Sequence, residues 1–273
     1  MSILLSGYYP EGIVFAADKN ATITYRDPGK KRYVEPTATK VLSWPHQKAV
    51  VGFVGLGTLA GLDLDEWMRI FIAGNLDFED FDSLAGSLRR KIQQDFSQEY
   101  PTDADVSDAH LVVHLGGFTR KQNVPVPVMY HIWNHGEIDT RTGAYPNARR
   151  EFYLREDVEA QFKGWPNPED YPVRVRQRLQ QMIDERRYFW FNNGANFAAF
   201  NVFKDAIWQA LHAIRDAGFG PKAPGLGARV AFCKMAVEVF GSYFTHHYDP
   251  AERVVGGGVD VAFIPWPEGP NAP

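Results

Sequence analysis

Short apolar runs separated by turn residues occupy the start of the chain and predict strands. Residues 2–9 and Gly12–Asp18 form one pair of runs, with a turn between them. After the polar loop Arg26–Arg32, Thr39–Trp44 and Lys48–Gly55 form a second pair. The last run is continuously apolar after its first lysine, so we expect it to be buried on both faces.

Apolar residues at helical spacing follow these strands. Residues 62–73 have an apolar stripe, made of Leu62, Trp67, Ile70 and Phe71. A second helix is expected after Asp82, because its apolar residues recur in steps of four and polar residues fill the other side. Two strands, Ala109–Phe118 and Val126–Asn134, are then predicted as a hairpin.

The C-terminal part of the chain predicts two more helices and a final strand. One amphipathic helix runs from Phe200 to Ile214, another begins near Ala228, and "GGGVDVAFIPW" reads as a glycine-led strand. Residues 135–170 have no assignable pattern, and residues 171–187 predict a charged, exposed helix. The helices come in pairs rather than one per strand. This order disfavours a doubly wound parallel sheet and favours an α+β fold with two antiparallel sheets face to face and helix pairs outside.

Composition narrows the class of protein. A chain of 273 residues with 45% hydrophobic residues can form one sizeable domain, so residues 1–273 are predicted to be a single domain. A net charge of −4 argues against a nucleic-acid partner. No apolar run reaches the roughly 20 residues that cross a bilayer, so no membrane partner is expected. The single cysteine and the absence of a signal-peptide pattern predict a cytoplasmic protein.

The first residues suggest a catalytic centre. Removal of Met1 would leave Ser2 with a free α-amine, whose pKa is about 7.7–8.0. Such an amine could take the proton of the serine hydroxyl, which is a weak nucleophile without a base. Lys40 could keep the pKa of that amine low, and Asp18 could orient the lysine. The alternatives are that Met-Ser is merely a common start, that Asp18 is a turn residue and that Lys40 is solvated.

The segment from Ser2 to Thr22 resembles the start of the proteasome β-subunit family of N-terminal nucleophile (Ntn) hydrolases. The likeness rests on the nucleophile position, a glycine turn and a second strand ending in "AADKNAT", with the family's spacing between nucleophile and aspartate. "TKVLSW" then offers Lys40, and "VGFVGLGTLAG" offers Gly55 as the backbone oxyanion donor. A weaker likeness covers "NNGANFAAF" and "GGGVDVAFI".

The resemblance implies a four-layer αββα sandwich that cleaves peptide or amide bonds by acyl transfer. It implies Ser2, Asp18, Lys40 and Gly55 as the catalytic residues, a homo-oligomer, a possible unfoldase partner and no cofactor or metal. Residues 135–190 would be an atypical insertion. The chain departs from the family in using serine instead of threonine and in lacking the accessory serines. The acidic partner before the last strand could be Glu252 or Asp249.

Other motifs have simpler interpretations. His246, His247 and Asp249 could suggest a metal site, but adjacent histidines on a helix point in different directions. "GLGTLAG" lacks the Lys-Ser/Thr ending of a phosphate loop. Cys233 lies on an apolar helix stripe and is expected in the core.

Two other functions stay open at this point. One is a catalytically inactive member of the family with an assembly or scaffolding role, which the missing serines favour. The other is an amidohydrolase that acts on a small amide, which would differ from a peptidase only in its pocket.

Overall fold

A computed structural model describes most of the chain. It covers residues 2–23, 33–35, 37–45, 49–78, 80–121, 124–136, 147–157, 174, 177–178, 180–181, 190–194, 197–218, 225–247 and 256–267. The predicted helix over 171–187 and the loop Arg26–Arg32 fall wholly or mostly outside these residues, as do Asp249 and Glu252.

The first sheet contains both ends of the described chain. Its order is β12 (Trp190–Gly194), β1 (Ile3–Tyr9), β2 (Gly12–Asp18) and β13 (Val259–Pro265), with every neighbouring pair antiparallel. Every residue of β1 and β2 is buried. The two N-terminal strands and the C-terminal strand predicted from the sequence are therefore confirmed.

The second sheet lies against the first. Its order is β11 (Ala148–Glu156), β10 (Val124–His135), β9 (Leu111–Lys121), β6 (Ala49–Gly55) and β5 (Val41–Ser43), again antiparallel. The prediction of a strand buried on both faces is confirmed for β6, where only the last residue is exposed. β11 lies in the stretch whose pattern could not be assigned, because charged residues outnumber apolar ones in this edge strand.

Four helices cover the outer faces of the sheets in the described part of the chain. They are α1 (Leu64–Ala73), α2 (Phe81–Glu99), α5 (Phe197–Asp216) and α6 (Leu226–His247). α2 begins at Asp80, whose carboxylate accepts hydrogen bonds from the N–H groups of Asp82 and Ser83. Two small hairpins, β3 (Ala21–Ile23) with β4 (Tyr33–Glu35) and β7 (Thr58–Leu59) with β8 (Leu62–Asp63), were not predicted.

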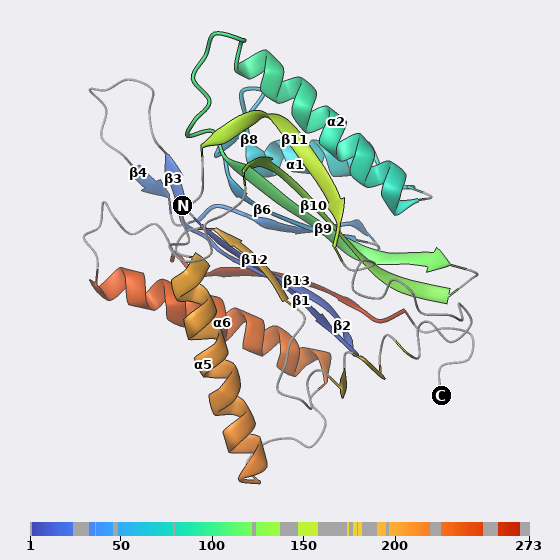
Figure 1. Ribbon diagram of the computed structural model, residues 1–273, viewed down its shortest axis with the longest axis vertical. Helices are drawn as coiled ribbons and strands as arrows, with labels where there is room; N and C mark the ends of the chain where they lie inside the picture. The colour runs from blue at the N-terminus through green and yellow to red at the C-terminus, as the bar shows by residue number, and fades with distance from the viewer. Residues whose placement is uncertain are drawn as a thin grey trace.

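Figure 1 shows the four layers of the molecule, and three apolar clusters lie between them. One joins α1 and α2 to the second sheet, one lies between the sheets, and one joins the first sheet to α5 and α6. Alternation along β1 divides its side chains between two of them. Leu4 and Tyr8 point between the sheets, whereas Ile3 and Leu5 point toward the helices. The predicted α+β fold, a four-layer αββα sandwich, is confirmed.

Cys233 was predicted to lie in the hydrophobic core. Cys233 is fully buried in the cluster beneath α6, and this burial raises the pKa of its thiol to about 12. The prediction of a core cysteine is confirmed.

Within the described residues, no helix has an apolar stretch that is long enough to cross a bilayer.

Candidate active site

The two sheets bring three of the four predicted residues together at one end of the sandwich. Ser2 and Asp18 come from neighbouring strands, because Leu4 pairs with Ala17 in the β1–β2 ladder. Lys40 comes from the second sheet, immediately before β5. Its carbonyl accepts a hydrogen bond from the Phe53 N–H of β6, at 3.0 Å. The site thus lies where the ends of β1, β2 and β5 meet.

The ammonium of Lys40 contacts three oxygen atoms. It donates to Ser2 Oγ at 2.6 Å, to Asp18 Oδ1 at 3.2 Å and to the carbonyl oxygen of Asn20. Ser2 Oγ also donates to the Asn20 carbonyl, at 3.4 Å. All three N–H donors of the lysine are therefore used, and one of them points at the hydroxyl of the candidate nucleophile.

Backbone N–H groups hold the Asp18 carboxylate from both sides. Ile3 N–H donates to Oδ1 at 2.7 Å, and Gly256 N–H donates to Oδ2 at 3.2 Å. These donors come from β1 and from the turn before β13. Asp18 therefore stands in a fixed position and in turn holds the end of the Lys40 side chain.

Burial dominates the electrostatics of this cluster. Ser2 is 6% exposed, Lys40 is 4% exposed and Asp18 is fully buried. Burial lowers the pKa of Lys40, and the Asp18 carboxylate opposes that shift. Burial also raises the pKa of Asp18, against the lowering effects of Lys40 and the two N–H donors. Both shifts favour the neutral forms, so a proton can leave the lysine at a smaller free-energy cost than in water.

Gly55 lies farther along β6 than the residue that bonds to Lys40. It lies two residues beyond Phe53, whose N–H bonds to the Lys40 carbonyl, and it ends the strand beside Leu111 of β9. Gly55 has φ +118°, and a Cβ there would lie 2.1 Å from the His110 carbonyl oxygen. Glycine is required at this position by its backbone conformation and by the close approach of the neighbouring chain.

Three groups at the site were not found from the sequence. The Asn20 carbonyl and the Gly256 N–H act through the backbone and leave no side-chain signal. Asp260, in β13, accepts a hydrogen bond from the Lys40 N–H at 2.8 Å. Its place within the apolar strand "VDVAFI" is a signal that could have found it, because a carboxylate there needs a partner.

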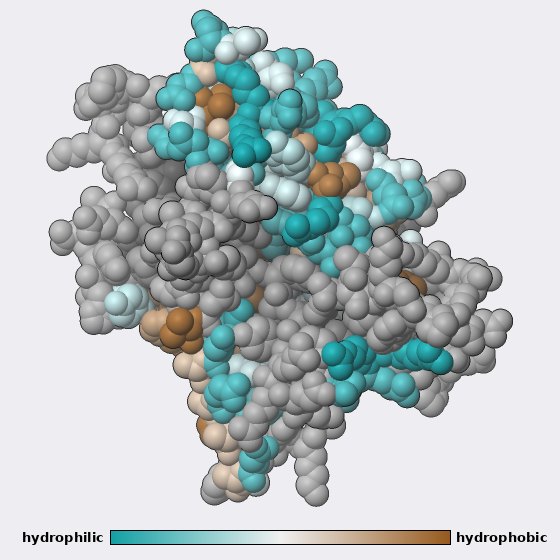
Figure 2. Space-filling model, in the orientation of Figure 1, coloured by the Kyte–Doolittle hydropathy of each residue, from teal (hydrophilic) through white to brown (hydrophobic). Residues whose placement is uncertain are grey.

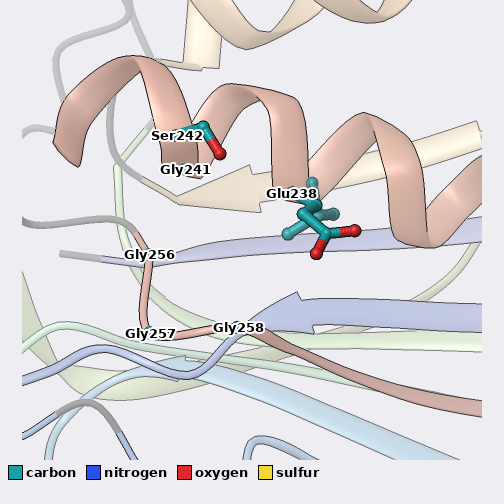
Figure 3. A pocket seen from close by; sticks show the side chains of 7 residues that line it. Glu238, Gly241, Ser242, Gly256, Gly257 and Gly258 are labelled. Carbon is teal, nitrogen blue, oxygen red and sulfur yellow. The ribbon is translucent and has the colours of Figure 1, made fainter. Parts of the chain in front are cut away.

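A small cavity of about 160 Å³ lies on the helix side of the first sheet, next to this cluster. Glu238 and Ser242 of α6 line it together with the glycines Gly256–Gly258 (Figure 3). All three glycines have positive φ, which allows the turn to run close under the helix. Because Gly256 also contacts Asp18, the cavity and the cluster share one turn.

Ser6, in β1, lies in a different polar cluster, between the two sheets. Ser6 Oγ is 2.8 Å from His114 Nδ1, and the ring of His114 meets the ring of His131 edge-on at 5.1 Å. His131 Nδ1 lies 3.6 Å from the Asp157 carboxylate, which also pairs with Arg155. Sequence analysis did not find this arrangement, since its members come from four strands or strand ends.

Within the part of the chain that the structure describes, no three His, Cys, Asp or Glu side chains form a group that could hold a metal ion. The side chains of His246 and His247 lie outside that part.

We compared the chain with protein families, curated proteins and solved structures. No protein-family profile matches the chain, and no curated protein matches it. The solved structure of Anbu (ancestral beta-subunit) from Yersinia bercovieri is similar over 96% of this chain and 81% of that protein. The sequence identity is 13% and the TM-score is 0.46.

Proposed function

We propose that the protein is an N-terminal nucleophile hydrolase of the proteasome-like type, which cleaves peptide or amide bonds through Ser2. Removal of Met1 would free the Ser2 α-amine to act as general base. Lys40 would favour the unprotonated amine through its charge, Asp18 would orient Lys40, and the Gly55 N–H would stabilise the oxyanion.

The reaction would proceed by acyl transfer. Ser2 Oγ attacks the carbonyl carbon of the substrate, and the hydroxyl proton passes to the α-amine. The protonated amine gives that proton to the leaving nitrogen as the C–N bond breaks, which leaves an ester on Ser2. Water then attacks the ester with the same amine as base, and the hydroxyl is regenerated.

The observation that supports this proposal most is the contact between Lys40 and Ser2. A lysine ammonium lies 2.6 Å from the serine oxygen and 3.2 Å from a fully buried carboxylate. A buried lysine carries a desolvation cost that a purely structural role seldom justifies. Perturbed titratable groups around a nucleophile are typical of catalytic sites.

The first experiment is intact-mass spectrometry followed by activity measurement. We expect the mass of a chain that has lost Met1, together with cleavage of fluorogenic peptide amides. An electrophilic probe such as a β-lactone should add once, at Ser2. Quantitative retention of Met1 with no activity, or full activity in Ser2→Ala, would refute the proposal.

The second candidate function is a catalytically inactive subunit with an assembly role. The burial of Ser2, at 6% exposed, favours it, because a nucleophile must be reached by a carbonyl carbon. In this case, the protein with Met1 removed would not react with the probe. Crystals soaked with the β-lactone would distinguish the two functions, since only an open site acquires density on Ser2 Oγ.

Either function fits a homo-oligomer. Large apolar side chains lie exposed along α5 and α6, and Figure 2 shows part of this apolar surface on α5. They are Val202, Leu211, Ile214, Val239 and Tyr243. Sedimentation-velocity analysis should show a species larger than the 30.9 kDa chain. Val202→Glu, the most exposed position of the set, should shift the distribution toward the monomer.

A further inference from the structure

Asp260 lies in the last strand, at a point where the first sheet faces the second. It pairs with Ala17 in the β13–β2 ladder, beside the pair formed by Val259 and Asp18. Two residues farther along β13, Ala262 belongs to the apolar cluster between the sheets. Alternation therefore directs the Asp260 side chain toward the second sheet.

The Asp260 carboxylate has two partners, one on each sheet. Its Oδ2 accepts a hydrogen bond from the backbone N–H of Lys40 at 2.8 Å. Its Oδ1 lies 3.2 Å from the ammonium of Lys19, which follows β2. With one oxygen on each side, the carboxylate links the two sheets next to the cluster of Ser2, Asp18 and Lys40.

This contact completes the fixation of the Lys40 backbone. The carbonyl of Lys40 already accepts the Phe53 N–H at 3.0 Å, so both of its backbone polar groups are bonded. The Lys40 side chain is then held at its far end by Asp18, Asn20 and Ser2. A side chain that is fixed at both ends keeps its ammonium at a defined distance from Ser2 Oγ.

We propose that Asp260 is a positioning residue for the reaction: it docks the Lys40 backbone against the first sheet and so sets where the lysine ammonium meets Ser2. This inference rests on the proposed function and adds a residue to its machinery. Asp260 acts through Lys40 and does not touch the reacting atoms. Its other oxygen pairs with Lys19 at 3.2 Å.

The test compares Asp260→Ala and Asp260→Asn in the protein with Met1 removed. Loss of the hydrogen bond in the alanine variant should reduce kcat by roughly 10- to 100-fold, because small displacements of catalytic groups have effects of that size. KM should change little, since the substrate contacts are intact. The asparagine keeps an acceptor oxygen, so it should restore most of the loss in kcat.

The pH profile adds a readout that a merely structural role would not move. The negative charge of Asp260 raises the pKa of Lys40. In the proposed mechanism Lys40 acts through its charge, so the uncharged Asp260→Asn should move the alkaline limb of kcat/KM, where Lys40 loses its proton, to lower pH. Asp95→Asn is a matched control: Asp95 is a buried carboxylate that accepts from Trp67 Nε1 and pairs with Lys91, away from this cluster. Its profile should not move.

Hydrogen exchange at the Lys40 amide tests the contact without using activity. The amide should exchange at least about tenfold faster in Asp260→Ala than in the parent protein, because a backbone N–H without its acceptor loses protection. If Asp260→Ala does not fold, the kcat and the pH profile of Asp260→Asn test whether Asp260 positions Lys40. Unchanged kcat with a lost amide contact, or an equal loss in Asp95→Asn, overturns the inference. Activity that survives Ser2→Ala refutes the proposed function instead, and amide exchange then tests the contact alone.

Discussion

Ser2, immediately before strand β1, and Ser6, within it, lie in polar clusters that differ in charge and in position. Lys40 donates a hydrogen bond to Ser2, and Asp18 holds the lysine. Ser6 is in the middle of the strand, 2.8 Å from His114 and fully buried between the sheets. Both hydroxyls lie beside a basic nitrogen, so proximity to a base does not by itself distinguish a nucleophile from a structural serine.

The surroundings of each base explain the difference. Burial keeps the pKa of His114 well below its ordinary value, with a smaller contribution from His131, so the imidazole near Ser6 stays neutral and satisfies a buried hydroxyl. Lys40 lies at the end of the sandwich with an ion-pair partner. A freed Ser2 amine would add a second base there. In the proposed function, Ser2 is therefore the nucleophile and Ser6 is a structural serine between the sheets.

The largest expected effect is the contrast between Ser2→Ala and Ser6→Ala. Removal of the nucleophile should lower kcat/KM on peptide amides by at least about 10³-fold. Ser6→Ala should leave kcat/KM unchanged in the folded fraction, because its hydroxyl contacts only groups between the sheets. Steady-state kinetics on both purified variants checks this. A Ser6→Ala protein that folds normally but has lost activity would reverse the assignment.

The second contrast concerns stability. Lys40→Met leaves the buried Asp18 carboxylate without its cationic partner, so the free energy of unfolding should fall by about 3–5 kcal/mol. His114→Leu removes only the partner of the neutral Ser6 hydroxyl, so the free energy of unfolding should fall by about 1–3 kcal/mol. Urea unfolding of both variants measures the difference. Equal losses would mean that the Lys40–Asp18 pair is not charged in the folded protein.

The third prediction concerns the end of β6. Gly55→Ala would place a Cβ 2.1 Å from the His110 carbonyl oxygen at a φ of +118°, so this strand end must shift. We expect a loss of stability of about 1–3 kcal/mol and a lower kcat. Gly57→Ala is the matched control, because nothing lies within 4 Å of a Cβ at that position. Thermal melting and kinetics check both variants, and a Gly55→Ala enzyme with normal kcat would exclude Gly55 as oxyanion donor.

The smallest expected effect is the acid sensitivity of the cluster around Ser6. Burial holds the pKa values of His114 and His131 below 6.5 in the folded protein, whereas an unfolded histidine titrates near 6.5. The unfolded chain therefore binds more protons below that pH. Stability should be fully present above about pH 6.5 and should fall by about 1.36 kcal/mol per pH unit and histidine below it.

His114→Gln tests this prediction, since glutamine does not titrate. The difference in unfolding free energy between pH 7.5 and pH 5.5 should shrink in the variant. Urea denaturation at the two pH values measures it. An unchanged difference would show that other groups cause the acid sensitivity.

Much of the fold could be predicted because its signals are local. Continuous burial of β6, the four-residue steps in α2 and the pairing of helices were all visible in the residue pattern. β11 was not assignable, because an edge strand rich in charge lacks a clear period. For the candidate site, the proximity of Ser2 and Asp18 could be predicted because one hairpin, β1–β2, connects them. Lys40 was named as the residue that could lower the amine pKa, and the family resemblance supported it.

By itself, the sequence determined the strands, the helices and which of their faces are apolar, because backbone hydrogen bonding imposes a repeat that side chains must follow. Only the tertiary structure decided which polar groups meet. The contacts of Lys40 with Ser2, of Asp260 with the Lys40 backbone and of Ser6 with His114 each join two sheets. Such contacts depend on how two packed surfaces are aligned, and no short-range pattern along the chain records that alignment.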